Sequence, residues 1–209
     1  MVCRIRFRKD GRMKFLSHLE LLKAWDRAMR REGIPLVFST GYSPRPLMTF
    51  ALPSAVGVRD MAGYMDVHVE DGFDPSRFYY LTKLPEGLEV LEAKEVEEVR
   101  ASLMSRVHSA DYAIEGDIEA LKRLKSTDPL PFVRITKRGR RHERDARDYL
   151  LDAEWTERVL RVRLLAGSEQ SIRLNEFIEA LTGDPEAHFT YQLTRLEIYD
   201  KEGRSLWEP

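Results

Sequence analysis

The sequence predicts an α+β fold built from two tandem ferredoxin-like (βαββαβ) units with antiparallel sheets. Apolar and polar residues alternate with period 2 in several segments, which indicates half-buried strands, and apolar residues at 3–4 spacing indicate helices between them. The elements follow the order strand, helix, strand, strand, helix, strand, and a similar order recurs in the second half. We expect one unit at 1–97 and another at 106–209. No residue-level repeat links the halves, so the duplication is inferred from element order alone.

The first unit opens with an alternating strand at 2–8. Its helix begins after Ser17, a suitable N-cap, and Glu20 three residues later completes a capping box. Gly33 and Pro35 end this helix. The apolar face of the helix consists of Leu21, Leu22, Trp25, Ala28 and Met29. The other elements expected in this unit are strands at 36–39, 47–51, 64–70 and 88–96 and a short helix at 74–84.

The acidic segment 95–100 is interpreted as a connector, and the second unit follows it. A basic run at 137–144 is interpreted as a flexible loop between strands, because such runs are usually solvated hairpins, and attraction of phosphate is the alternative. The strands expected in the second unit lie at 110–115, 132–136, 149–155, 159–165 and 190–199, and its helices at 117–125 and 175–181.

The composition excludes several classes of protein. No apolar run approaches the roughly 18–20 residues of a membrane span, and residues 1–8 lack the apolar core of a signal peptide. The single cysteine, Cys3, cannot form an internal disulfide or hold an iron–sulfur cluster alone. The glycine-rich phosphate-binding motifs are absent. We therefore expect a cytoplasmic protein that uses no cofactor and has no membrane partner.

The charge is distributed unevenly along the chain. Residues 1–60 carry 12 Lys and Arg against 5 Asp and Glu, a balance of +7, whereas 61–130 carry 8 against 15, a balance of −7. On the first helix, four basic residues share the side opposite the apolar face. An uneven distribution of charge of this kind is informative about the binding partners of a protein and not about its fold. It predicts a phosphate-bearing ligand on the N-terminal third, although basic residues near a helix C-terminus also favour the helix dipole and need solvation.

The candidate RNA- or anion-binding residues combine cations with an aromatic ring, as in RNA-binding proteins. They are Arg12, Lys14, His18, Lys23, Arg27, Arg30, Arg31, Tyr42 and Arg45. Residues of the supporting motif are Ser17, Gly41, Pro44, Pro46, Tyr64 and Asp66.

The neighbours Ser17 and His18 look like a nucleophile beside a base. Adjacent helical residues point about 100° apart, however, so Ser17 is better explained as the cap and His18 as a residue that binds a ligand, acts as a base or packs on the core. Asp66 and His68 share a strand face and could join His18 around a metal. The five histidines show no ligand spacing, and we predict no metal site.

Segments 14–20, 27–35, 41–46, 50–53 and 64–67 form a set of motifs: KFLSHLE, RAMRREGIP, GYSPRP, FALP and YMDV. As a set they resemble the radical-SAM-linked family, a bacterial domain of unknown function found alone or at the C-terminus of radical S-adenosylmethionine proteins. The resemblance implies an accessory or substrate-holding module. Arg45 stands where that family often has histidine and Gly63 where it often has glutamate, which weakens an acid–base or metal role but leaves anion binding by Arg45. The chain lacks C-x-x-x-C-x-x-C, so it is not itself the radical enzyme.

Three functions remain open from the sequence. The leading hypothesis is a non-catalytic module that binds RNA (tRNA or ribosomal RNA) or an RNA-associated substrate and presents it to a radical SAM enzyme. A metal-independent endoribonuclease would instead use His18 as general acid or base. An adaptor would use the basic third to meet an acidic protein surface. The sequence does not indicate an oligomeric state.

Overall fold

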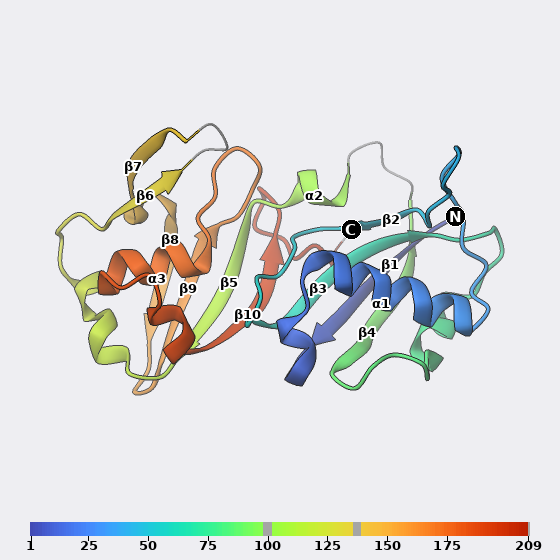
Figure 1. The fold of residues 1–209 in the computed structure, drawn as a ribbon, viewed down its shortest axis with the longest axis horizontal. Helices are drawn as coiled ribbons and strands as arrows, with labels where there is room; N and C mark the ends of the chain where they lie inside the picture. Colours follow the sequence, from blue (N-terminus) through green and yellow to red (C-terminus); the bar gives the residue numbers. More distant parts are fainter. Residues whose placement is uncertain (98–101, 136–138, 209) are drawn as a thin grey trace.

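The computed structural model describes residues 1–97, 102–135 and 139–208 and shows an α+β fold (Figure 1). The strands are β1 (Val2–Lys9), β2 (Met48–Phe50), β3 (Arg59–His68), β4 (Leu88–Val96), β5 (Ser109–Glu115), β6 (Pro131–Ile135), β7 (Arg141–Asp145), β8 (Leu150–Trp155), β9 (Val159–Leu165) and β10 (Gln192–Tyr199). The α-helices are α1 (His18–Arg31), α2 (Leu103–Arg106) and α3 (Leu174–Thr182), and the 3₁₀ helices are η1 (Gly11–Phe15), η2 (Pro75–Tyr80), η3 (Ile118–Lys125), η4 (Ala146–Tyr149) and η5 (Ala187–Thr190).

Eight of the described strands form one sheet in the order β4-β1-β3-β10-β5-β9-β8, with β2 paired to β3. One end of β3 (Met65 to Val67) pairs with β2, and its other end (Arg59 and Asp60) pairs with β10. The β3–β10 pairing is parallel, and the other described strand pairs are antiparallel. The predicted α+β class with antiparallel strands is confirmed. Nothing in the residue pattern had indicated that the two halves share a sheet.

Helices α1 and α3 lie in front of this sheet in Figure 1, α1 over the first half and α3 over β8 and β9. Beneath α1, Trp25 packs edge-on against Phe7 with ring centroids 5.2 Å apart, in a core that also contains Met65 and Val67 of β3. A second core lies under α3 and η3, and it includes Tyr64 of β3. Alternate residues of β3 thus belong to different cores.

Helix α1 ends where the sequence predicts. The Ser17 hydroxyl accepts the Glu20 N–H at 3.4 Å and the Glu20 carboxylate accepts the Ser17 N–H at 2.8 Å, which is the predicted capping box. After the C-cap, Gly33 has φ 65°, in the region that glycine adopts without strain.

Three predicted elements differ from the structure. The strand expected at 36–39 is wrong: only isolated bridges at Leu36 and Phe38 form there, because neighbouring Pro35 and the turn at 40–44 break the ladder. The helices expected at 74–84 and 117–125 are 3₁₀ helices. The basic run lies in the exposed β6–β7 hairpin, in agreement with a solvated hairpin, but Arg141 to Arg144 belong to β7 and not to a flexible loop. Residues 98–100 of the connector and 137–138 of that run lie outside the described residues.

A buried ion pair sits at the junction of the halves. Asp60 and Arg195, whose side chains are 1% and 2% exposed, face each other across the β3–β10 pairing. Arg195 Nε donates to Asp60 Oδ1 at 3.0 Å, its Nη2 donates to Oδ2, and its Nη1 donates to the Leu52 carbonyl at 2.9 Å. A bidentate ion pair of this kind fixes the relative orientation of the two side chains as well as their distance. It therefore constrains how β3 and β10, and with them the two halves, are joined.

Lys9 lies fully buried beside this pair, opposite Asp60 in the β1–β3 register. Its Nζ has no hydrogen-bond partner in the described part of the chain. Burial lowers the pKa of Lys9 to about 8, and the neighbouring Asp60 carboxylate only partly offsets this effect. The charged lysine therefore costs folding free energy at neutral pH.

Replacing Asp60 by asparagine is expected to destabilise the protein by roughly 3–5 kcal/mol, because it leaves the Arg195 charge buried without a counter-ion. The double variant Asp60→Leu with Arg195→Met should recover most of that loss, since it removes both charges. Urea unfolding of the three proteins measures the difference. A loss below about 1 kcal/mol in the single variant would show that the pair does not hold the junction.

Lys9→Met is expected to be more stable than the wild type at pH 7, by up to about 3 kcal/mol. The folded-state pKa of Lys9, about 8, lies below that of an unfolded lysine, so its cost is full below pH 8 and disappears as the pH rises past roughly 10.4. The difference between variant and wild type should shrink over that window. Lys83→Met, at an exposed lysine, serves as the control, and a pH-independent gain in Lys9→Met would contradict the assignment.

Candidate functional site

The predicted cations lie around the exposed side of α1. We call Arg12, Lys14, Lys23, Arg27, Arg30, Arg31, Tyr42 and Arg45 the basic surface. Lys23 and Arg27 are exposed and form no ion pair within residues 1–97, 102–135 and 139–208. The acidic residues of the helix and its C-cap are already engaged: Glu20 accepts from Ser17, Asp26 pairs with Arg30, and Glu32 accepts from Thr82. Lys23 and Arg27 therefore have no ion-pair partner among the described residues, although Glu20 keeps its charge and attracts Lys23 electrostatically.

Aromatic rings accompany these cations. Phe15 is 60% exposed and Lys14 Nζ lies 5.2 Å from its ring centroid. The Arg30 guanidinium carbon lies 4.7 Å from the ring centroid of partly exposed Phe38. Tyr42 is fully exposed. Of these three rings, the sequence indicated only Tyr42 as a binding residue. Phe15 and Phe38 could have been recognised because each stands close to basic residues in the sequence without belonging to an apolar face.

The two ends of α1 carry the rest of the basic surface. Arg12 and Lys14 lie on η1 at its N-terminal end, and segment 38–46 rises at the upper right of Figure 1, on the side of its C-terminal end. A helix of 14 residues separates them by roughly 20 Å.

Segment 38–46 is a short closed loop. The Ser39 N–H donates to the Arg45 carbonyl at 2.8 Å, and the Arg45 N–H donates to the Ser39 hydroxyl at 3.0 Å. Gly41, with φ 126°, allows the turn, while Pro44 and Pro46 restrict the returning arm. The arrangement holds the Tyr42 and Arg45 side chains out in water.

Ser17 and His18 do not form a catalytic pair. The Ser17 hydroxyl donates to Glu20 Oε2 at 2.7 Å. The His18 ring packs edge-on against Phe50 at 5.2 Å, and its Nδ1 is buried without a hydrogen bond to any described residue. Neither side chain is arranged for proton transfer with the other.

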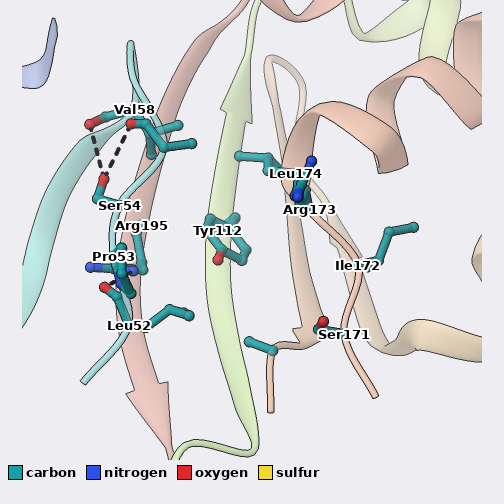
Figure 2. Close-up of a pocket in the computed structure, with 12 residues that line it drawn as sticks. Leu52, Pro53, Ser54, Val58, Tyr112, Ser171, Ile172, Arg173, Leu174 and Arg195 are labelled. Carbon is teal, nitrogen blue, oxygen red and sulfur yellow. Dashed lines mark hydrogen bonds between the residues drawn. The ribbon is translucent and has the colours of Figure 1, made fainter. Parts of the chain in front are cut away.

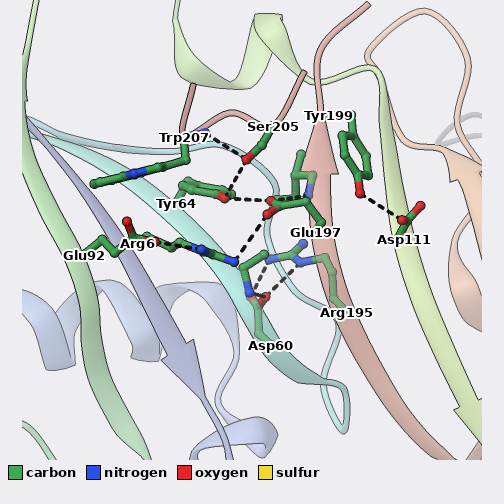
Figure 3. A network of polar contacts seen from close by, with 12 residues as sticks. Arg6, Asp60, Tyr64, Glu92, Asp111, Arg195, Glu197, Tyr199, Ser205 and Trp207 are labelled. Atoms are coloured by element: carbon green, nitrogen blue, oxygen red, sulfur yellow. Dashed lines mark hydrogen bonds and ion pairs between the residues drawn. The ribbon is translucent and has the colours of Figure 1, made fainter. Parts of the chain in front are cut away.

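Tyr64 and Asp66 face away from α1. Asp66 accepts two hydrogen bonds from Arg4, at 2.8 and 2.9 Å. Tyr64 donates to Glu197 at 2.6 Å and contacts Ser205 at 3.2 Å (Figure 3). Burial and the hydrogen bond to Glu197 raise the pKa of Tyr64. Two members of the supporting motif thus maintain the fold.

The arrangement of β3 also separates the metal ligands considered from the sequence. Asp66 and His68 lie on the face opposite Met65 and Val67, which pack under α1, where His18 is found. Among the described residues, no group of three His, Cys, Asp or Glu could hold a metal. Nor is any described helix long and apolar enough to cross a membrane.

A cavity of about 260 Å³ lies between the halves (Figure 2). Segment 52–58 and Arg195 form one wall, segment 171–174 forms the other, and Tyr112 of β5 lies between them. The sequence did not indicate this cavity, because its walls are far apart along the chain. Its lining residues are Leu52, Pro53, Ser54, Ala55, Val58, Tyr112, Ala166, Ser171, Ile172, Arg173, Leu174 and Arg195.

A family model described as "Uncharacterized protein conserved in bacteria (DUF2344)" matches residues 3–174. No curated protein matches the chain. Among solved structures, a chain of the "Crystal Structure of a Cbf5-Nop10-Gar1 Complex" is similar at 10% identity with a TM-score of 0.47. The match covers 95% of this chain and 50% of that one, so the chain spans about half its length. A similarity this distant carries no argument about function.

Ser17→Ala is expected to destabilise the protein by about 1 kcal/mol, because it removes the cap of α1. Binding of RNA and any activity toward RNA should be unchanged at temperatures where the variant is folded. Thermal unfolding and RNA titration measure the two effects, with Ser43→Ala at an exposed turn position as control. An RNA-dependent activity that disappears in the folded Ser17→Ala protein would restore the nucleophile hypothesis.

Proposed function

The chain belongs to the DUF2344 family of uncharacterized bacterial proteins, and we propose that it binds single-stranded segments of tRNA or ribosomal RNA through the basic surface. The observation that carries this proposal is the juxtaposition of exposed aromatic rings and cations around α1, where Lys23 and Arg27 have no ion-pair partner in the described chain. Proteins that hold single strands combine a positive track for the backbone with rings on which bases stack. Sequence-specific recognition of RNA also targets single-stranded loops and ends.

The charges supply the backbone contacts. Lys23 and Arg27 would contact phosphates directly, since no acidic side chain of the described chain pairs with them. Arg31 is held more firmly, because its Nε donates to the Arg27 carbonyl at 3.1 Å and its Nη2 to the Lys83 carbonyl at 3.3 Å. A held guanidinium keeps its full charge, and phosphate contacts of this kind depend on salt through counter-ion release.

The rings supply stacking at both ends of the track. Phe15 lies near the N-terminal end of α1 and Tyr42 on the segment near its C-terminal end, so a helix of roughly 20 Å lies between the two rings. That span suits a short strand within the roughly 4–16 nucleotides of known single-strand sites.

We also propose that both halves are ferredoxin-like units. The strand orders support it: β4-β1-β3 with β2 in the first half and β10-β5-β9-β8 in the second correspond strand for strand. Within the strands of the shared sheet, α1 and η3 follow the first strand of each half (β1 and β5). Likewise, η2 and α3 follow the third (β3 and β9).

The partner proposed is a radical SAM protein, to which this module would present its RNA. The support is the set of motifs at 14–67, all in the half that carries the basic surface. Affinity purification of the tagged chain with and without nuclease treatment tests the contact. Recovery of such a protein without RNA would favour an adaptor, and recovery only with RNA would favour presentation. The endoribonuclease alternative finds no support in the packing of His18 against Phe50.

Substituting Lys23 and Arg27 together by glutamine is expected to weaken RNA binding and to lower the slope of log K against log salt by about 1.4, or about 0.7 per phosphate contact. Tyr42→Ala should weaken binding by about 1–3 kcal/mol with an unchanged slope, since it removes stacking alone. Fluorescence anisotropy with labelled tRNA and single-stranded RNA at several salt concentrations measures both.

The matched control is Arg158→Gln with Arg161→Gln, two exposed arginines of the second half. It should leave affinity and slope near the wild-type values. Equal losses in the control and the α1 variant would mean that binding is diffuse, and salt-independent or absent binding in the wild type would exclude RNA as the ligand.

A further inference from the structure

We propose that the cavity between the halves takes one unstacked base of the bound RNA strand, with the adjoining phosphate on Arg173. This inference rests on the proposed RNA binding and names the part of the RNA that the protein would single out. It is carried by the charge and shape of the cavity, which do not depend on the basic surface, and by the position of the cavity next to that surface.

The charge of the lining is one-sided. The twelve lining residues include two arginines and no carboxylate. Arg195 is neutralised by buried Asp60. Arg173 is exposed, and its guanidinium contacts no acidic side chain of the described chain. It stands at the start of α3, where the Glu176 carboxylate accepts the Arg173 N–H at 2.9 Å and pairs with Arg134. The Arg173 guanidinium thus keeps its charge for an anion at the mouth of the cavity.

The shape of the cavity suits a flat, partly apolar ring. Tyr112 lies between walls that carry apolar side chains from segments 52–58 and 171–174 (Figure 2). A volume of about 260 Å³ lies just below the roughly 300–1,000 Å³ of drug-sized sites, which favours a single ring system.

Polar groups are available for the edge of such a ring. The Ser54 hydroxyl makes only marginal contacts, at 3.5 Å, with the carbonyls of Ala55 and Val58. Ser171 has no side-chain hydrogen bond to a described residue. Hydroxyls donate and accept, so both can turn toward a base.

The cavity is also connected to the basic surface. The Gly57 N–H donates to the Lys14 carbonyl at 2.9 Å, which fixes the cavity wall 52–58 against η1. Phe15 on η1 is a stacking ring of the proposed track. A strand that leaves Phe15 therefore meets the rim of the cavity next, and a base turned out of the stack there would enter it.

Two substitutions separate the cavity from the surface. Ala55→Trp fills the cavity from an exposed loop position, and Val56→Trp places the same ring on the adjacent exposed residue, which does not line it. Arg173→Gln removes the phosphate contact, with Arg158→Gln as its control. The probes are uridine and adenosine 5′-monophosphate, inorganic phosphate, and a single-stranded RNA of about ten nucleotides carrying one 2-aminopurine.

The expected result is that a nucleoside monophosphate binds the wild type by calorimetry and phosphate alone does not. Ala55→Trp should abolish this binding and Arg173→Gln should weaken it roughly tenfold, while both controls bind as the wild type does. On the RNA, 2-aminopurine fluorescence should change as the base unstacks in the wild type and in Val56→Trp, but not in Ala55→Trp.

Other results overturn the inference in distinguishable ways. If the wild type and Ala55→Trp bind RNA equally, with no fluorescence change, base binding in the cavity is excluded and the proposed binding at the basic surface is unaffected. Monophosphate binding without RNA binding would leave a site for a free nucleotide and remove the proposed function. Inorganic phosphate bound as tightly as the monophosphates would show that no base is recognised.

Discussion

The ion pair between Asp60 and Arg195 is the constraint on which the architecture depends. The parallel pairing of β3 with β10 involves only two residues of each strand, which is too short a ladder to orient two halves by itself. The buried, two-pronged contact supplies the missing orientation. Its third hydrogen bond, to the Leu52 carbonyl, fixes the start of segment 52–58. Joining the halves therefore also positions a wall of the cavity.

The two candidate sites differ in how they arise. The basic surface is formed by a contiguous piece of sequence around α1, so it requires only that one helix and two flanking turns fold. The cavity requires segments from both halves, and its wall residue Arg195 is itself a partner in the junction. A weakened junction would therefore affect the cavity first. The hydrogen bond between Gly57 and Lys14 makes segment 52–58 common to both sites.

The sequence predicted what local patterns determine. The capping box at Ser17 and the apolar face ending before Gly33 depend on residues within one or two turns, and both are confirmed. The partner of Asp60 lies 135 positions away, and no periodicity identifies it. The predicted helix at 117–125 is wound as 3₁₀ because the choice between two helix types follows packing more than pattern. The cavity was not predicted either, because its lining residues are far apart in the sequence and look like ordinary core and loop positions.

Charge pairing decides which of the early arginines are available to the proposed RNA. Arg4, Arg6 and Arg8 of β1 belong to the same basic third of the chain, yet each pairs with an acidic side chain. On the face opposite α1, the C-terminal segment adds further contacts, since Arg4 donates to the Leu206 carbonyl and Lys94 lies 4.4 Å from the Trp207 ring centroid. A phosphate arriving there would have to displace these partners. On α1 it would displace only water from Lys23 and Arg27, so the proposed RNA would meet fewer competing ion pairs on the helix side of the first half.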